Sequence, residues 1–350
     1  MSAKLSPARK FLYSVIVFVA FFALLEVNLR LIGVESFAEN QFFPLNRDVS
    51  FVGIYDKDSE LFWRLKKDIL AESRTFSSLS YRINRDGFRG PEIVEDNRQT
   101  ILALGNSCTF GWGVVADSIF TARLQQRLAD YRVLNRGVPG YSSHQGRILY
   151  ERVTSRIAPE ITLIMFGWND HWPAGADISD QEHDPLPQWA LDAQNSLSRL
   201  RTFQMLRRVT LDLSAPDESA RPRFDLVAGK RRVGLSEFKD NLQAIIQRAR
   251  SVGSEPVLLI PPIAALEVYL PDAGASAFHD LHARYQRAIA ETAAATSTLL
   301  IDLQPAFDGR KDLFDYPLED PAHFNAAGHA VVADEVLRLL RDETRLASPD

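Results

Sequence analysis

One serine, one histidine and one aspartate in this sequence have the residue types and the order of a nucleophilic triad. Ser107 follows an apolar, strand-like run, Ile101 to Leu104, through a Gly-Asn turn. A serine hydroxyl attacks well only when a neighbouring base removes its proton, and that base is usually a histidine held by a carboxylate. Near the end of the chain, Asp320-Pro-Ala-His323 supplies both groups. The pattern therefore predicts acyl chemistry on Ser107, with His323 as the base and Asp320 as its partner.

Four short blocks in a fixed order extend this pattern. They are G-N-S at Gly105 to Ser107, N-R-G at Asn135 to Gly137, G-W-N-D at Gly167 to Asp170 and D-P-A-H at Asp320 to His323. Together they resemble the motifs of SGNH/GDSL-type serine hydrolases. The segment N-R-D-G-F-R-G-P-E, Asn84 to Glu92, resembles the lead-in of a membrane-anchored bacterial branch of that family.

The resemblance implies an oxyanion hole beside Ser107. Its donors would be the backbone N–H of Ser107, the backbone N–H of Gly137 and the side-chain amide of Asn169. These residue types suit the task, because glycine lets the backbone approach a substrate closely and an amide donates without adding charge. Most members have aspartate where this chain has Asn106. Asparagine keeps the size and the acceptor oxygen, so the turn should persist.

Other reactive residues have weaker claims. Cys108 follows the nucleophile and is expected to be a small packed side chain, the alternative being a reactive thiol. Asp170 is expected to support its loop. The remaining candidates are the histidines His144, His171, His279, His282 and His329. His171 is near enough to Asn169 in the sequence to line the site. His279 and His282 lie three residues apart, but no carboxylate or cysteine cluster completes a metal site around them. We expect neither a metal nor a cofactor.

The composition points to one globular domain with appendages. The chain has 350 residues, of which 46% are hydrophobic and 24% charged, enough to bury one large core. A net charge of −5 provides no electrostatic footprint for nucleic acid. The single cysteine rules out an internal disulfide framework.

The amino terminus predicts a membrane anchor. Residues 1–10 carry Lys4, Arg9 and Lys10. An uninterrupted apolar run, Phe11 to Leu25, follows, and the helical pattern continues to Ile32. As a helix, residues 11–32 would span about 33 Å, enough for a hydrocarbon core of about 30 Å. Basic residues before the helix predict a cytoplasmic tail and a catalytic domain outside the cytoplasmic membrane, which is the periplasm in a Gram-negative bacterium. The alternative is a signal peptide cleaved near Ser36-Phe37-Ala38.

The rest of the chain alternates between strands and helices. Residues 33–97 are interpreted as a strap that packs on the catalytic domain, residues 98–344 as that domain and residues 345–350 as a tail. Five apolar runs, each followed by a helical pattern, predict a three-layer α/β/α flavodoxin-like sandwich with a five-stranded parallel sheet. The runs are 100–104, 132–134, 161–166, 256–260 and 298–302.

An insertion at residues 172–230 interrupts this alternation. It contains one helical stretch, Trp189 to Leu211, with apolar and basic sides. Its place after the third strand puts it at the rim of the predicted site, so it is a possible lid, and a packed surface helix is the equal alternative.

The sequence thus predicts a serine esterase or deacylase that hydrolyses acyl esters, O-acetyl esters among them, through an acyl-serine intermediate. Its partners would be a small acyl ester or an acylated glycan or lipid, and the membrane through the amino-terminal helix. Two alternatives stay open. One is an O-acyltransferase that uses the same serine on envelope glycans, and the other is a binding module that keeps the fold without catalysis.

Overall fold

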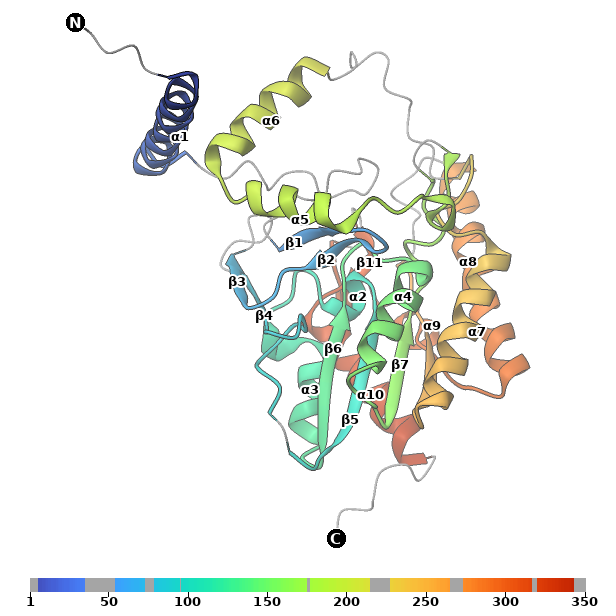
Figure 1. Ribbon diagram of the computed structural model, residues 1–350. Helices are drawn as coiled ribbons and strands as arrows, with labels where there is room; N and C mark the ends of the chain where they lie inside the picture. Colours follow the sequence, from blue (N-terminus) through green and yellow to red (C-terminus); the bar gives the residue numbers. More distant parts are fainter. Residues whose placement is uncertain are drawn as a thin grey trace, which may run out of the picture.

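Five parallel strands in the order β6-β5-β7-β8-β9 form the central sheet (Figure 1). The computed structural model describes residues 6–34, 54–72, 79–94, 96–174, 177–214, 227–264, 273–316 and 320–342. The order places the first strand of the sheet, β5, second from one edge, as in a flavodoxin-like sheet. The strands are β5 (Gln99–Gly105), β6 (Tyr131–Gly137), β7 (Ile161–Met165), β8 (Glu255–Ile260) and β9 (Leu299–Asp302).

Helices cover both faces of the sheet. Along β5, Leu102 and Leu104 belong to the core shared with α4 and α7, whereas Ile101 and Ala103 belong to the core shared with α3 and α10. This alternation is the two-residue period of a strand buried on both faces. The predicted three-layer α/β/α sandwich is therefore confirmed. The helices of these layers are α3 (Phe120–Arg127), α4 (Ser143–Thr154), α7 (Leu235–Ser251), α8 (Ala273–Thr296) and α10 (Ala326–Asp342).

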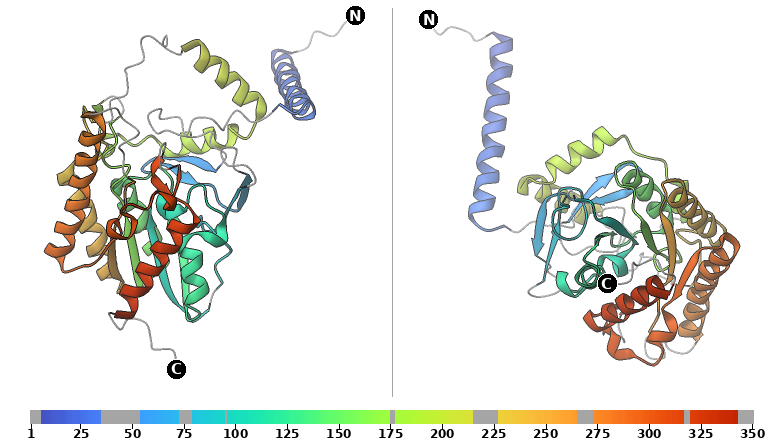
Figure 2. Two further views of the ribbon diagram at one scale, coloured as in Figure 1. Left: turned by 180° about the vertical axis from the view of Figure 1, so that it is seen from behind. Right: turned by 90° about the horizontal axis from the view of Figure 1, so that it is seen from below.

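The amino-terminal helix α1 spans Pro7–Leu31 and is long and apolar enough to cross a membrane. It begins before the predicted run because Ser6 caps it and proline occupies its first position. Glu26 and Arg30 form an ion pair of 2.7 Å one turn apart. Figure 2 shows α1 projecting from the domain beside α6. The alternative cleavage site, residues 36–38, lies outside the described residues.

The stretch Trp189 to Leu211, which the sequence predicted as one helix, is divided between two α-helices among the described residues of the insertion. Helices α5 (Gln188–Leu197) and α6 (Arg201–Ser214) are separated by a short break. Glu26 of α1 accepts hydrogen bonds from the backbone N–H groups of Arg201 and Thr202 at 3.0 and 2.9 Å. This carboxylate caps the amino end of α6 from a distant part of the chain, so the helical pattern of the insertion could not reveal the break.

Two hairpins precede the sheet and pack on it. The first pairs β1 (Tyr55–Asp58) with β2 (Phe62–Leu65), and the second pairs β3 (Ile69–Glu72) with β4 (Ser80–Ile83). The Trp63 indole donates to the carbonyl of Pro139 at 3.1 Å, and the Tyr141 hydroxyl donates to the carbonyl of Trp63 at 2.5 Å. Both rings are buried. The first hairpin thus contacts the loop after β6, which borders the predicted site.

The other helical pieces are short. They are η2 (Ala116–Ser118), η4 (Asp180–Glu182), α9 (Gln304–Phe307) and η6 (Lys311–Leu313).

Helix α5 packs on the first hairpin. The Asn195 side chain accepts a hydrogen bond from the backbone N–H of Lys57 at 2.8 Å and donates one to the backbone carbonyl of Lys57 at 3.0 Å. Part of the insertion is therefore fixed to the domain.

Glu237, in the first turn of α7, makes stability depend on pH. One of its carboxylate oxygens is buried without a hydrogen-bond partner, and burial, reinforced by the charge of Asp180, raises its pKa to about 7. Between about pH 4.5 and 7 the folded chain therefore binds this proton more tightly than the unfolded chain does. We expect the free energy of unfolding to fall as pH rises through that window, and Glu237→Gln to remove about 2 kcal/mol of the fall. Urea denaturation of both proteins at several pH values measures this pH dependence of the free energy of unfolding.

The matched control is Glu151→Gln, which changes an exposed carboxylate on α4. It should leave the slope of stability against pH as it is in the original chain. Equal slopes in all three proteins would contradict the assignment to Glu237.

Candidate active site

Ser107 lies at the carboxyl end of β5, where helix α2 (Ser107–Phe110) begins. A Cβ on Gly105 would lie 2.1 Å from the hydroxyl oxygen of Thr109 and 2.6 Å from the carbonyl oxygen of Met165. Glycine therefore lets α2 fold directly over the end of the sheet. Asn106 caps the helix, because its side-chain oxygen accepts from the N–H of Cys108 at 3.0 Å. The expectation that the turn persists with asparagine is confirmed.

A small hairpin brings the predicted histidine and aspartate to this serine. Strand β10 (Phe314–Tyr316) pairs with β11 (Asp320–Phe324), which carries both residues. His323 Nε2 lies 2.7 Å from Ser107 Oγ, and His323 Nδ1 lies 2.5 Å from Asp320 Oδ2. The three side chains form a continuous hydrogen-bonded chain. Its order is the one in which a carboxylate orients a base and the base accepts the proton of a hydroxyl.

Asp320 is held in its charged form. Burial alone would raise its pKa, but the charge of His323 and the hydrogen bonds from His323 and from the N–H of Ala322 outweigh burial and lower the pKa below its usual range. Its Oδ1 accepts the backbone N–H groups of Ala322 and His323, each at 3.1 Å. Oδ2 is left to face the imidazole, so the carboxylate is positioned by its own turn.

The loop after β6 contacts the segments that carry two of the predicted oxyanion donors, Ser107 and Asn169. The N–H of Val138 donates to the carbonyl of Gly105 at 3.0 Å, and the Asn169 amide donates to the carbonyl of Tyr141 at 3.0 Å. The loop therefore joins the serine turn to Asn169. The N–H of Gly137 donates to the Asn135 side chain at 3.0 Å. That of Gly140 has no hydrogen-bond acceptor in the described part of the chain.

Two residues that hold the serine helix were not singled out as functional by the sequence. The Asn135 amide donates to the carbonyl of Thr109 at 2.8 Å and to the hydroxyl of Thr121 at 3.1 Å. The Arg89 guanidinium donates to the carbonyls of Phe110, Gly111 and Val114. Asn135 lies within a recognised block and Arg89 within the lead-in pattern, but neither signal indicates what the side chain contacts.

Replacing Arg89 with methionine should destabilise the domain. Arg89 is 4% exposed, and its guanidinium lies over the rings of Tyr81 and Phe110. Methionine would fill much of the space, but the carbonyls that Arg89 binds would lose their hydrogen-bond donor. Each buried carbonyl left without a donor costs about 1–3 kcal/mol. Because the chain around them can relax, we expect a loss of about 3 kcal/mol in the free energy of unfolding. Urea denaturation followed by tryptophan fluorescence measures this loss.

Arg85→Met is the matched control for that change. Arg85 precedes the same turn, but its side chain is 74% exposed. Its replacement should change stability by less than about 0.5 kcal/mol. A similar loss in both variants would show that the contacts of Arg89 contribute little.

The other reactive residues do not take part in the hydrogen bonds that link Ser107 Oγ to His323 and His323 to Asp320. Cys108 is 2% exposed and burial raises the pKa of its thiol, so it is a packed side chain, as predicted. His171 is fully buried and lies 3.0 Å from His282, Nε2 to Nδ1; the expectation that it lines the site is wrong, because it turns into the core. Burial lowers the pKa of both imidazoles. His329 accepts from the N–H of Phe120 at 3.2 Å.

Two further carboxylates, those of Asp170 and Asp315, have pKa values that burial raises. Asp170 supports its loop, because it accepts from the N–H groups of Ser143 at 2.7 Å and Gly167 at 2.9 Å. Burial raises its pKa to about 6. Asp315 on β10 was missed by the sequence interpretation. Burial raises its pKa to about 6 as well, and its charge interacts with those of His323 and Asp320.

Comparison with known proteins covers most of the chain. Residues 103–331 match the sequence model of the GDSL-like lipase/acylhydrolase family. A lipase/acylhydrolase from Enterococcus faecalis is 18% identical with a TM-score of 0.44, covering 70% of this chain and 96% of its own. The acetylxylan esterase Axe2 from Geobacillus stearothermophilus is 20% identical with a TM-score of 0.42, covering 69% and 93%. No curated protein sequence matches the chain significantly.

Proposed function

Because this chain belongs to the GDSL-like lipase/acylhydrolase family and is therefore an enzyme that hydrolyses ester bonds, we propose that it works through an acyl intermediate on Ser107. The observation that carries the proposal is the hydrogen-bonded chain from Ser107 through His323 to Asp320. These side chains meet the geometric requirement for an activated nucleophile, since the base is within hydrogen-bond reach and is oriented by a third group.

In the first step, Ser107 Oγ attacks the ester carbonyl carbon while His323 Nε2 takes the hydroxyl proton. Asp320 stabilises the imidazolium that forms. The tetrahedral intermediate then collapses, and the leaving alkoxide takes the proton from His323. Water attacks the acyl-serine by the same route in reverse, His323 again acting as the base. The products are a carboxylic acid and an alcohol.

Negative charge on the carbonyl oxygen requires donors that are already in place. Ser107 supplies its backbone N–H at the start of α2, and Asn169 supplies its amide. The third donor expected from the family pattern is the backbone N–H of Gly137. This N–H already donates to the side-chain oxygen of Asn135, and that hydrogen bond would have to break first. We propose the N–H of Gly140 in its place, because it lies between the Val138 and Tyr141 contacts and has no competing acceptor among the described residues. A structure with a phosphonate bound to Ser107 would distinguish the two donors. The phosphonate oxygen should lie within about 3.2 Å of the backbone nitrogen of Gly140, and a contact with that of Gly137 instead would contradict the proposal.

We further propose that α1 anchors the enzyme in the cytoplasmic membrane and that the catalytic domain lies outside it. The length and apolar surface of α1 support an anchor, and the basic residues before it support this orientation. Fusion of a reporter that is active only in the periplasm to the carboxyl terminus tests the orientation. An active reporter supports the proposal, and an inactive reporter on a stable fusion contradicts it.

An exported and tethered esterase would meet acyl groups on glycans or lipids of the envelope. We propose these esters as its substrates, O-acetyl esters among them. Acetate release from acetylated glycans, compared with release of longer acyl chains from lipid esters, would identify the class. If the acyl group moved to an added glycan in preference to water, the transferase alternative would replace hydrolysis.

A fluorophosphonate probe tests the nucleophile itself. The full chain should be labelled at Ser107, and Ser107→Ala should not be labelled. Absence of labelling in a folded original chain would contradict an activated serine. Labelling that persists in Ser107→Ala would assign the nucleophile elsewhere.

A further inference from the structure

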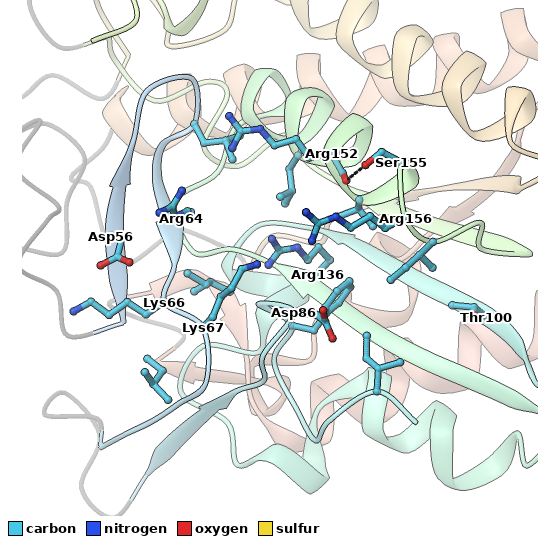
Figure 3. Close-up of a pocket in the computed structure, with 18 of the residues that line it drawn as sticks. Asp56, Arg64, Lys66, Lys67, Asp86, Thr100, Arg136, Arg152, Ser155 and Arg156 are labelled. Atoms are coloured by element: carbon cyan, nitrogen blue, oxygen red, sulfur yellow. Dashed lines mark hydrogen bonds between the residues drawn. The ribbon is translucent and has the colours of Figure 1, made fainter. Parts of the chain in front are cut away.

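A strongly basic cleft lies apart from Ser107, between the two hairpins and the face formed by β6 and α4 (Figure 3). It has a volume of about 1320 Å³ and is called the basic cleft below. Among the described residues that line it, eight are arginine or lysine and two are aspartate, so the lining carries a large excess of positive charge. None of the residues of the hydrogen-bonded triad lines it.

Some of these cations are neutralised by acids beside the cleft. Arg152 binds Asp58 at 2.8 Å, and Arg64 approaches the same carboxylate at 3.4 Å. Arg132 binds Asp96 at 2.7 Å. These pairs form part of the wall, and their contribution to the positive potential is reduced accordingly.

Three other cations make no such ion pair, although the charge of Asp86, which also lines the cleft, acts on Lys67 and Arg136. Lys67, Arg136 and Arg156 come from the turn after β2, from β6 and from the segment after α4, and in Figure 3 their side chains point towards one shared space. Within the described part of the chain, none of the three is in ion-pair contact with a carboxylate. Burial, and then the facing charges of Arg156 and Arg136, lower the pKa of Lys67. Like charges that converge in this way repel one another unless an anion lies between them.

Arg136 is built into this arrangement. It is 9% exposed, donates to the carbonyl of Gly87 and lies over the ring of Phe88, 5.1 Å from its centroid. Its Nε is buried without a hydrogen-bond partner. The guanidinium is therefore held in place before any ligand arrives, with one donor still unused.

The remaining wall of the cleft is aliphatic. It includes Leu61, Leu65, Leu149, Val153 and Ile157. Arg199, at another part of the lining, accepts on its carbonyl oxygen a hydrogen bond of 3.1 Å from Arg30 at the end of α1. The cleft thus extends to the end of the proposed membrane anchor, where lipid headgroups would lie.

We propose that the basic cleft binds an anionic amphiphile through its phosphate group, with the phosphate between Lys67, Arg136 and Arg156 and the acyl part against the aliphatic wall. A phosphate has enough acceptor oxygens to meet three donors at once and enough charge to offset them, whereas a neutral glycan has no charge to offer. The site is separate from Ser107, so it would hold a lipid without cleaving it.

Calorimetric titration of the full chain in a neutral detergent tests this proposal. The chain carries Ser107→Ala so that no ligand is hydrolysed. The ligands are dihexanoyl phosphatidic acid, inorganic phosphate and dihexanoyl phosphatidylcholine. We expect the phosphatidic acid to bind at least about ten-fold more tightly than either of the others, since only it combines an unshielded phosphate with acyl chains.

Lys67→Gln and Arg156→Gln should each weaken that binding about ten-fold. Arg287→Gln, which removes an exposed charge on α8 outside the cleft, is the matched control and should bind as before. A different outcome is that inorganic phosphate binds as tightly as the lipid and loses its binding in the same variants. That result would support the anion site and identify its ligand as free phosphate instead of a lipid. Equal binding of phosphatidylcholine, or binding unaffected by both variants, would overturn the proposal. None of these outcomes depends on an active serine, so they stand apart from the test of the hydrolase.

Discussion

Ser107→Ala should reduce kcat/KM for p-nitrophenyl acetate by at least about 10⁴-fold. The methyl group cannot form the acyl intermediate, and His323 would have no hydroxyl to deprotonate at the 2.7 Å contact. Any remaining rate would come from water activated by His323 and from donors around the carbonyl oxygen. Steady-state kinetics of the purified full chain measure the loss, with circular dichroism to show that the variant is folded.

The neighbouring thiol does not complicate this prediction. Cys108 is buried, its pKa is raised by burial, and its sulfur lies 3.4 Å from the carbonyl oxygen of Ala322. Ser251→Ala, at the exposed end of α7, is the matched control and should keep the full rate. A loss of less than ten-fold in folded Ser107→Ala would mean that another group is the nucleophile.

Asp320→Asn should reduce kcat/KM by about 10³-fold to 10⁴-fold while leaving the fold intact. The asparagine oxygen can still accept from the N–H groups of Ala322 and His323, where Oδ1 accepts now. Its NH2 would then face His323 Nδ1 and donate to it. That contact favours the tautomer with the proton on Nε2, which cannot accept the proton of Ser107.

Fluorophosphonate labelling of the variant should slow in parallel with the loss of rate. Asp312→Asn is the control, because Asp312 lies in the same part of the chain but pairs with Arg310 at the surface. If Asp320→Asn kept more than a tenth of the activity, another acid would have to orient His323. Asp315 would be the first to test, since its charge already interacts with that imidazole.

Much of the fold was predictable because its signals are local. The apolar runs of the five strands and the apolar stripes of the helices depend on residues close together in sequence. The same is true of the Asn106 cap and of Asp320 and His323, which share one short strand. Strands β5, β6 and β8 are longer than the predicted runs, because hydrogen-bond partners on the neighbouring strand extend them, whereas β7 and β9 are each one residue shorter.

The features that the sequence did not predict depend on contacts between distant segments. Glu26 divides the helix of the insertion by capping α6, and Arg89 binds carbonyls of the serine helix from a turn before the sheet. The basic cleft gathers cations from residue 64 to residue 199, which no local pattern connects.

Local patterns were enough to predict the type of fold, and to select Ser107, Asp320 and His323 in their order along the chain. Three features became visible only in the folded chain. Strand β11 carries His323 to within hydrogen-bond distance of Ser107, His171 turns into the core, and the N–H of Gly137 donates to the side chain of Asn135. Propensity and hydrophobic period describe how a single segment folds and which of its faces is buried. The register and packing of whole elements decide which side chains meet, and those depend on the rest of the chain.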